Sequence, residues 1–381
     1  MFQKESGCNT AFFSNFMLQK LQDADLTVSI QFIEITSRRI NFMKSSILIL
    51  TIFFFVSIAN AQWQKQTVDS KASLRGLSVV NEKIVWASGT GGTFLRTTDG
   101  GKIWKVGKVP DAEKLDFRDV EAFDANTAYL LSIGEGENSR IYKTTDGGET
   151  WKLQFKNTNP KAFFDAFAFW DANNGIAMSD PVEGKYLLIA TTDGGQTWKQ
   201  LPNDKMPPAK EGEAAFAASG TCLITNGKSD VFLVTGGQAA RVFHSRNRGA
   251  SWLVADTPIV SGTNGSGIFS IAMFDQRRGV IVGGNYEKPN EAANNLALTN
   301  DTGQTWTLGK GLNGYRSGVA FVDKNGLIAV GSSGSDISRD GGKSWTNLDK
   351  ENYNAVVTKG RNAIWAVGAN GLVARYFIPK K

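Results

Sequence analysis

Cysteine and histidine are scarce in this chain of 381 residues, which contains Cys8, Cys222 and a single histidine, His244. One histidine excludes a zinc site built from several histidines, and it leaves one candidate for a Ser-His-Asp triad. His244 lies directly before a structural repeat described below, so we interpret it as an ordinary strand residue. Because Cys8 falls in a segment that we expect to be removed, Cys222 has no partner for an internal disulfide.

Helical periodicity is also missing after residue 61, and so are the common cofactor motifs. The glycine-rich stretches Gly89–Gly92 and Gly331–Gly334 do not precede a helix, so we interpret them as turns rather than phosphate-binding loops. No calcium loop of the EF-hand type occurs. We therefore expect no metal and no cofactor. The 42 basic and 36 acidic residues are interspersed and give a net charge of +6, which provides no case for a nucleic-acid partner.

The chain does contain one short motif in six copies, with the common form Ser/Thr-x-Asp-x-Gly-x-Ser/Thr-Trp, which we call the repeat motif. Its Asp side chain can accept backbone N–H bonds within a turn, its Gly supplies a positive φ, and its Trp opens the following strand. Two copies deviate mildly, because Ile103 replaces a Ser/Thr and Asn247 replaces the Asp. The third positions of the six copies are Asp99, Asp146, Asp193, Asn247, Asp301 and Asp340.

The spacing of the repeat motif predicts the fold. Successive copies are separated by 47, 47, 54, 54 and 39 residues. A four-stranded propeller blade requires about 40–45 residues, and apolar runs such as Asp230–Gly236 and Gly326–Gly331 are typical of buried strands. The predicted fold class is therefore all-β, a β-propeller in which each copy of the motif closes a hairpin.

The two ends of the repeat region predict the number of blades. The predicted strands at 354–357, 364–368 and 372–377 follow the last copy of the motif and lack a fourth partner, while Trp63–Gln66 resembles the strands that follow the motif. We expect this N-terminal strand to complete the last blade of seven, which would remove an open sheet edge. Six or eight blades are the alternatives. The seven tryptophans at the equivalent position are Trp63, Trp104, Trp151, Trp198, Trp252, Trp306 and Trp345.

Residues 43–61 have the pattern of a secretory signal peptide. A basic start is followed by an apolar stretch from Ile47 to Ile58 and by the small residues Ala59-Asn-Ala61. The apolar stretch is short for a membrane span, which needs about 20 residues. We therefore expect cleavage before Gln62 and no stable membrane span afterwards; the alternative is a membrane anchor with a short N-terminal tail.

The predicted domain organisation follows from that cleavage site. Residues 1–42 are expected to be a mis-called upstream extension, residues 43–61 the signal peptide, and residues 62–381 one seven-bladed propeller. The protein is then exported, either to a periplasm or to the outside of the cell.

The repeat motif resembles the Asp-box, or BNR, repeat of sialidase-type propellers. With seven blades and the C-terminal closure, residues 62–378 resemble the photosystem II stability/assembly factor-like family, in a bacterial branch whose members often carry oxidoreductase or glycosyl hydrolase labels. The resemblance implies an exported scaffold with an assembly role. The Arg-Ile-Pro motif of sialidases does not occur, which disfavours that activity. The segments that carry the likeness to the bacterial branch are Phe163–Trp170, Ser179–Tyr186, Glu211–Gly220 and Tyr315–Phe321.

The expected architecture indicates which face of the ring could bind a ligand. The repeat motif lies on one face, and the interblade and second-to-third connections lie on the other. The long connections at 133–140, 179–185 and 284–295 favour that second face in blades 2 to 5. Charged residues at its inner strand starts are either solvated at a wet channel mouth or form a ligand pocket. The candidate residues are Arg75, Arg118, Asp119, Asp165, Asp180, Glu183, Lys185, Tyr186, Glu213, Tyr286 and Arg316.

Two functional hypotheses remain from the sequence. The first is a non-enzymatic, monomeric scaffold that binds a protein, glycan or small ligand at this face. The second is a glycoside hydrolase whose channel-mouth carboxylates act as acid and base, with their separation deciding between retaining and inverting chemistry. The carboxylates available for the second hypothesis are Asp119, Asp165, Asp180, Glu183 and Glu213.

Overall fold

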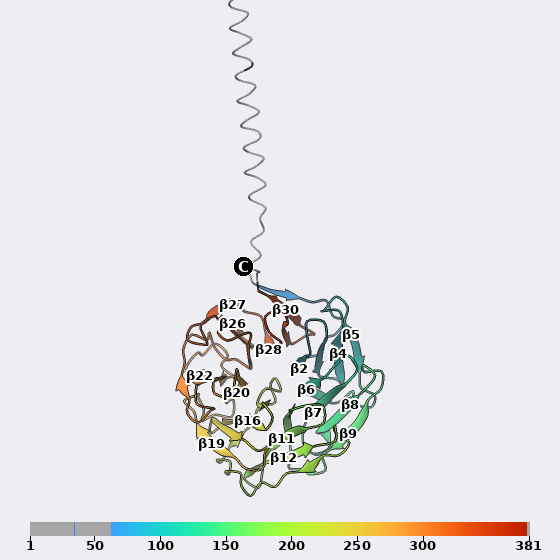
Figure 1. The fold of residues 1–381 in the computed structure, drawn as a ribbon, viewed down its shortest axis with the longest axis vertical. Coiled ribbons are helices and arrows are strands. Elements are labelled where there is room, and N and C mark those ends of the chain that lie inside the picture. The colour runs from blue at the N-terminus through green and yellow to red at the C-terminus, as the bar shows by residue number, and fades with distance from the viewer. Residues whose placement is uncertain (1–33, 35–61, 379–381) are drawn as a thin grey trace, which may run out of the picture. The chain divides into compact units, whose positions relative to one another are not determined.

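Strands are almost the only regular secondary structure of the described chain. The protein was analysed as a computed structural model, which describes residue 34 and residues 62–378. The predicted signal peptide, and the predicted extension apart from residue 34, lie outside the described residues. Within residues 62–378 there is one short 3-10 turn, η1 (Gly136–Asn138), and no α-helix. The strands form antiparallel sheets arranged as a ring (Figure 1), so the predicted all-β propeller is confirmed.

The ring has seven four-stranded blades, each numbered from its inner strand outward. Blade 1 consists of β2 (Leu74–Val79), β3 (Val85–Gly89), β4 (Thr93–Thr97) and β5 (Lys105–Lys108). Blade 2 consists of β6 (Asp116–Ala122), β7 (Ala128–Ile133), β8 (Arg140–Thr144) and β9 (Lys152–Lys156). Blade 3 consists of β10 (Phe164–Phe169), β11 (Gly175–Val182), β12 (Lys185–Thr191) and β13 (Lys199–Gln200). Blade 4 consists of β15 (Leu223–Asn226), β16 (Asp230–Val234), β18 (Arg241–Ser245) and β19 (Leu253–Asp256). Blade 5 consists of β20 (Ser266–Met273), β21 (Gly279–Asn285), β22 (Leu296–Thr299) and β23 (Thr307–Leu308). Blade 6 consists of β24 (Gly318–Phe321), β25 (Leu327–Gly331), β26 (Gly334–Ser338) and β27 (Thr346–Asp349). Blade 7 consists of β28 (Tyr353–Thr358), β29 (Ile364–Gly368), β30 (Val373–Phe377) and β1 (Gln62–Lys65).

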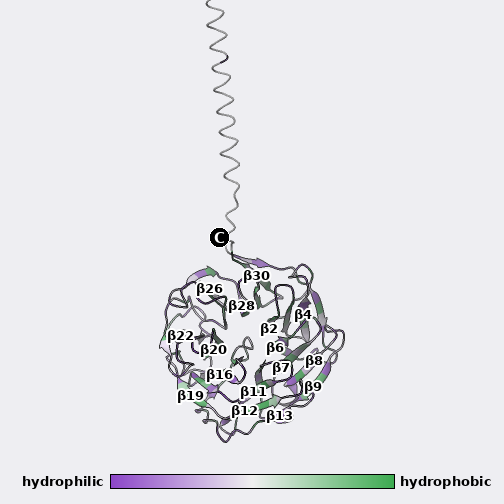
Figure 2. Cartoon of the chain, in the orientation of Figure 1, coloured by the Kyte–Doolittle hydropathy of each residue, from purple (hydrophilic) through white to green (hydrophobic). Residues whose placement is uncertain are grey.

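Burial falls from the middle of each blade to its outer edge. Every residue of β3 and β29 is buried, as expected for apolar strands covered on both faces, whereas both residues of β13 are exposed. Hydrophilic residues colour much of the outermost strands, such as β9 and β13 (Figure 2). The core therefore lies between neighbouring blades, and the outer strands face solvent.

The repeat motif forms the turn between the third and fourth strands of a blade. In the second copy, the Asp146 carboxylate accepts the Thr150 N–H at 2.9 Å and the Thr150 hydroxyl at 2.5 Å, while Thr144 Oγ1 accepts the Gly148 N–H at 2.9 Å. Asn247 accepts the equivalent N–H of Ser251 at 2.9 Å, which explains why Asn is tolerated there. In both copies the Asp or Asn side chain forms its hydrogen bonds within its own turn.

The motif tryptophans fill the gaps between blades. Trp151, which ends the blade 2 motif, packs edge-on against Trp86 and Phe94 of blade 1, with ring centroids 6.3 and 5.1 Å apart. Trp104 of blade 1 packs in the same way on Trp365 of blade 7, at 5.6 Å. Aromatic contacts of this geometry add to the stabilisation from burial, so the repeated Trp holds each blade to the one before it.

The N-terminal strand closes the ring, as predicted. Strand β1 pairs with β30 in antiparallel register, with Trp63 opposite Tyr376. The Trp63 ring packs on Tyr353 and Tyr376 at 5.2 and 5.3 Å, and its Nε1 donates to Ser335 Oγ of blade 6 at 3.0 Å. The first described strand therefore covers the outer edge of the last blade and ties it to its neighbour.

Blade 4 departs from the predicted pattern. The sequence predicts an inner strand that begins near Glu213, but β14 (Glu213–Ala214) pairs with β17 (Gly236–Gly237), which joins the sheet of blade 5. The inner strand of blade 4 begins only at Leu223. The segment between β14 and β15 instead runs into the centre of the ring (Figure 1). We call residues 215–221 the plug.

Candidate functional site

The plug is held across the centre by hydrogen bonds to five other blades. Its Ala215 N–H donates to Asp180 Oδ1 at 2.8 Å, and its Ala217 and Ala218 carbonyls accept from Arg118 at 3.2 Å and from Arg75 at 3.3 Å. The far end of the plug binds blades 5 and 6: Ser219 Oγ donates to the Ser317 carbonyl at 2.8 Å, and the Thr221 and Ser270 hydroxyls are 2.7 Å apart.

A cavity of about 530 Å³ lies at the channel mouth over the plug, on the face opposite the repeat motif. This volume is in the range of small-ligand pockets. Five of the sequence-predicted residues line it, and so do several aromatic residues. The charged and aromatic residues of the lining include Arg75, Arg118, Phe163, Asp165, Asp180, Phe216, Phe269, Tyr286 and Tyr315.

A repeated β-bulge aims side chains into this pocket. The inner strands of blades 1, 2, 3, 5 and 7 each have a register shift within their first four residues, which leaves one residue extra on the inner strand. The extra residue lines the pocket in every case. These five residues are Arg75, Arg118, Asp165, Phe269 and Asn354.

The two pocket arginines differ in how their charges are balanced. Arg118 Nε donates to Asp116 Oδ2 at 2.8 Å, so its charge has a carboxylate partner. Arg75 donates to the Ala218 carbonyl and forms no ion pair with any described residue. Burial, together with the nearby Arg118 charge, lowers the pKa of Arg75. Arg75 therefore presents an unneutralised guanidinium to the pocket.

Blade 3 contributes two carboxylates to the pocket wall. Burial raises the pKa of Asp180 to about 6. Burial first, and then the charge of Asp180, holds the pKa of Asp165 well above its usual value. Asp180 accepts the plug N–H of Ala215, but Asp165 Oδ2 is buried without a hydrogen-bond partner. The pair lies on neighbouring strands, β10 and β11, at the bulge that places Asp165 on the pocket wall.

Aromatic rings complete the pocket. Phe216 of the plug stacks on Phe269 with ring centroids 3.9 Å apart and planes 4° apart, and Tyr315 meets Phe269 edge-on at 4.7 Å. Tyr286 stands at the rim with 48% of its surface exposed. The pocket thus combines apolar surface with charges of both signs.

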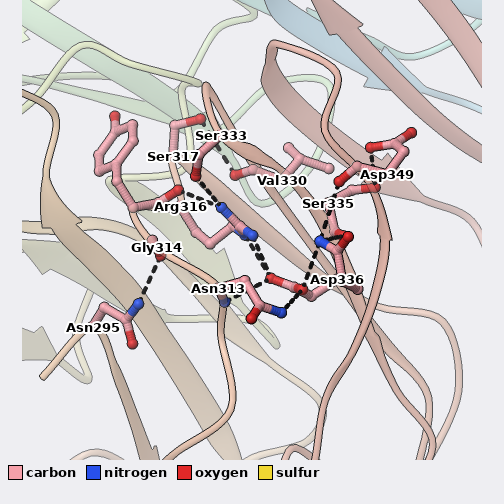
Figure 3. A network of polar contacts seen from close by, with 12 residues as sticks. Asn295, Asn313, Gly314, Arg316, Ser317, Val330, Ser333, Ser335, Asp336 and Asp349 are labelled. Atoms are coloured by element: carbon pink, nitrogen blue, oxygen red, sulfur yellow. Dashed lines mark hydrogen bonds and ion pairs between the residues drawn. The ribbon is translucent and has the colours of Figure 1, made fainter. Parts of the chain in front are cut away.

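Two of the predicted residues are buried in ion pairs outside the pocket. Glu213 binds Arg241, whose Nε donates to Glu213 Oε1 at 2.9 Å. Arg316 Nε donates to Asp336 Oδ2 at 2.8 Å, and Asn313 and Ser333 join the same network (Figure 3). These pairs belong to the structural interior, so Glu213 and Arg316 are placed away from the other candidates.

The remaining predicted residues also lie outside the lining. Asp119 is buried beside the plug and accepts the N–H groups of Val120 and Phe167 at 2.9 and 3.0 Å. Tyr186 is fully buried in the interblade core. The predicted loop 179–185 is mostly strand, since β11 and β12 meet at the tight turn Glu183–Gly184, and Lys185 Nζ donates to the Asn203 carbonyl at 3.0 Å.

The sequence interpretation missed Phe216, Phe269 and Tyr315. Phe269 and Asn354 occupy the same bulge position as Arg75 and Arg118, but an apolar or amide residue at a strand start carries no sign of function in the sequence. The plug has a weak signal: the 54-residue gap before Asn247 leaves room for an insertion, and residues 214–220 are rich in Ala, Ser and Gly.

Two further properties bear on the possible functions. Among residue 34 and residues 62–378, no group of three or more His, Cys, Asp or Glu side chains is placed to hold a metal ion. Over the same part of the chain, no helix has the length and apolar character needed to cross a membrane.

The fold and the plugged pocket define a seven-bladed β-propeller with one ligand-sized cavity at its channel mouth. Solved structures share this fold. YCF48 bound to a D1 peptide has a TM-score of 0.63 at 15% identity, over 84% of this chain and 97% of that one. YCF48 from Cyanidioschyzon merolae has a TM-score of 0.62 at 18% identity, over 83% and 99%. YCF48 is a photosystem II assembly factor, so the resemblance stated from the sequence agrees with the structural neighbours.

An enzyme propeller is similar as well. The GH74 enzyme of Niastella koreensis has a TM-score of 0.55 at 16% identity, and the match covers 82% of this chain but 53% of that one. The chain thus spans about half the length of that enzyme. No protein-family model matches the chain, and no curated protein sequence does. At these identities the likeness shows the fold.

Proposed function

We propose that the protein is an exported, non-enzymatic scaffold that binds a peptide segment of a partner protein in the channel-mouth pocket, and that it works as a monomer. The observation that carries the proposal is Arg75, whose guanidinium lines the pocket beside aromatic rings and has only a backbone carbonyl as its partner. A guanidinium without a carboxylate partner attracts acidic groups and can bind them with two parallel hydrogen bonds.

The structural neighbours support a partner-binding role. The similar YCF48 structure is bound to a D1 peptide, and its propeller matches nearly its full length to this chain. A seven-bladed ring of this size is a rigid frame, and its pocket is the natural place for a short extended segment. We infer an assembly or stability role of the same general kind, without any link to photosynthesis.

Export is part of the proposal. Cleavage after Ala61 would leave β1 intact, because that strand begins at Gln62. N-terminal sequencing of secreted or periplasmic protein is expected to start at Gln62. Recovery of residues 1–42 in the mature product would contradict it.

Site-specific photo-crosslinking tests the binding face. A photo-reactive phenylalanine derivative at Tyr286, which is 48% exposed at the pocket rim, is compared with the same derivative at Ile103, which is 73% exposed in a repeat motif on the other face. We expect a defined partner to crosslink from position 286 in producing cells and none from position 103. The crosslink should be lost when Arg75→Gln is added. Crosslinking from position 103 alone, or a crosslink at 286 that Arg75→Gln leaves unchanged, would contradict the proposal.

A glycoside hydrolase is the second candidate, because two of its five predicted carboxylates, Asp165 and Asp180, share the pocket. One carboxyl group with a raised pKa beside another is the arrangement that acid and base catalysis requires. Assays of the purified protein on aryl glycosides and β-linked oligosaccharides decide the matter. Turnover that disappears in Asp165→Asn would favour the glycoside hydrolase hypothesis. Absence of turnover on all substrates would favour the scaffold hypothesis.

A further inference from the structure

The pocket carboxylates differ from the buried carboxylates Glu213 and Asp336 in lacking a partner of opposite charge. Glu213 and Asp336 are completely buried, and each is paired with an arginine, Arg241 and Arg316 respectively. Asp165 is 1% exposed, yet neither it nor Asp180 forms an ion pair with any described residue. Two buried carboxylates of the interior are thus neutralised by arginine, whereas the two at the pocket have no cation, and the third interior carboxylate, Asp119, is compensated by two backbone N–H groups.

The nearby arginines are occupied elsewhere. Arg118 binds Asp116 at 2.8 Å and the Ala217 carbonyl at 3.2 Å, and Arg75 binds the Ala218 carbonyl. A buried carboxylate is costly unless a cation or hydrogen-bond donors compensate for the lost water. Asp119 receives two backbone N–H groups, whereas Asp165 Oδ2 receives none. The pocket wall therefore contains a carboxyl oxygen, Asp165 Oδ2, that a positively charged hydrogen-bond donor of a ligand could bind.

The shape and lining of the pocket indicate what kind of cation fits. No described group of three or more His, Cys, Asp or Glu side chains could hold a metal ion, which favours an organic cation over a bare metal. Phe163 and Phe216 line the same cavity as Asp165, and aromatic faces attract ammonium and guanidinium groups. A volume of about 530 Å³ is large enough for a lysine or arginine side chain together with adjoining main chain.

We propose that Asp165 and Asp180 form a subsite for the ammonium or guanidinium group of a lysine or arginine in the bound peptide. The inference rests on the proposed function, since it specifies one residue class in the peptide that the pocket takes. Arg75, which lines the same pocket from blade 1, then binds an acidic group of the same ligand. Burial raises the pKa of Asp165 because it disfavours the ionised carboxylate. A bound cation favours the ionised form and so offsets that cost.

Binding of matched short peptides to the wild-type protein is the primary test. The probes are fluorescein-labelled peptides that differ at one position, which is lysine, arginine, glutamine or norleucine, in a library that also varies the neighbouring residues. Norleucine keeps the length and apolar stem of lysine without its charge. We expect lysine and arginine peptides to bind at least about tenfold more tightly than their norleucine counterparts.

Two variants connect that preference to the subsite. Asp165→Asn and Asp180→Asn should each reduce the lysine-over-norleucine preference to about twofold or less, with Asp180→Asn serving if the first variant folds poorly. Glu211→Gln, which removes an exposed carboxylate before β14, should keep the full preference.

The outcomes separate this inference from the proposed function. Equal affinity for lysine and norleucine peptides, with binding still dependent on Arg75, would overturn the cation subsite and leave peptide binding intact. A lysine preference that survives in both Asp165→Asn and Asp180→Asn would also overturn it. If no peptide of the library binds, the proposed function fails, and the subsite fails with it.

Discussion

The carboxylates of the repeat motif and those of the pocket are the same chemical group in opposite surroundings. Hydrogen bonds from the Ser344 hydroxyl and N–H lower the pKa of Asp340 to about 2, and equivalent bonds from Thr197 lower the pKa of Asp193 to about 2. Burial raises the pKa of Asp180 to about 6 and holds that of Asp165 well above normal. The motif carboxylates are exposed or half-buried and accept several hydrogen bonds, whereas Asp165 is buried, Asp180 is half-buried, and neither has a cation as its partner.

This difference separates folding from binding. A carboxylate that accepts several turn hydrogen bonds in its ionised form stabilises the folded chain. A buried carboxylate without a partner costs stability in the free protein, and that cost is recovered when a ligand supplies the missing charge. The face with the motif turns therefore holds the hairpins together, and the face with the pocket is available for a partner.

The largest effect on stability should come from removing the arginine of a buried ion pair. Arg241→Ala leaves Glu213 buried without its cation, and we expect a loss of about 3–5 kcal/mol in the free energy of unfolding. Urea denaturation measures it. The double variant Arg241→Met with Glu213→Leu is the control and should recover much of the loss. A loss below about 1 kcal/mol would contradict the structural role of this pair.

The pH dependence of stability should distinguish the buried carboxylate Asp119, beside the plug, from the carboxylates of the repeat motif. Burial raises the pKa of Asp119 to about 7, so the folded protein binds more protons than the unfolded chain between about pH 4 and 7, and stability falls as the pH rises through that window. The contribution is on the order of 2–4 kcal/mol. The motif carboxylates act in the opposite sense, because their stabilisation is present above about pH 4 and is lost towards pH 2. Thermal melts from pH 2 to 9 measure the profile, and Asp119→Asn should flatten its decline above pH 4.

A smaller loss is expected from one motif turn. Asp340→Ala removes the acceptor of the Ser344 N–H at 2.9 Å and the Lys343 N–H at 3.0 Å, and should cost about 1 kcal/mol because these groups are exposed to water. Asp340→Asn is the matched control and should cost less, since the Asn247 side chain accepts the bond from Ser251 N–H in blade 4 that corresponds to the bond from Ser344 N–H. A variant that melts like the wild type would show that the turn does not depend on its carboxylate.

The smallest effect on stability is predicted for the pocket. Asp165→Asn replaces a buried carboxyl group that no described cation compensates with a neutral amide of similar shape, so the melting temperature should stay the same or rise by about 1–2 °C. Calorimetry at pH 7.5 checks this. A fall comparable to that of Asp340→Ala would place Asp165 among the structural carboxylates.

The sequence predicted the parts of the fold that repeat. The six motifs, the seven tryptophans and the pairing of β1 with β30 all follow from periodic signals that a propeller needs. Arg75, Arg118 and Asp165 were found because charged residues stand at strand starts, and the bulge then turned them into the pocket. Signals of this kind depend on local chain geometry alone.

The remainder of the site depends on register and on tertiary contacts. Arg316 lies one residue before Ser317, which lines the pocket, and a shift of one residue in a strand sends the side chain to the opposite side. Glu213 was misplaced because the plug occupies the chain between it and β15. Arg316 and Asp336 are 20 residues apart in the sequence, and Glu213 and Arg241 are 28 residues apart. No local sequence pattern predicts ion pairs between residues at such separations.

The most direct measurement of the central claim compares peptide affinity in Asp340→Ala and Asp165→Asn, each at a temperature where the variant is fully folded. The lysine peptide that binds the wild type most tightly serves as the probe, with affinity measured by fluorescence anisotropy. The account predicts unchanged affinity in Asp340→Ala and at least about tenfold weaker binding in Asp165→Asn. Full affinity in Asp165→Asn together with loss of binding in folded Asp340→Ala would show that the working surface is the face of the repeat motif.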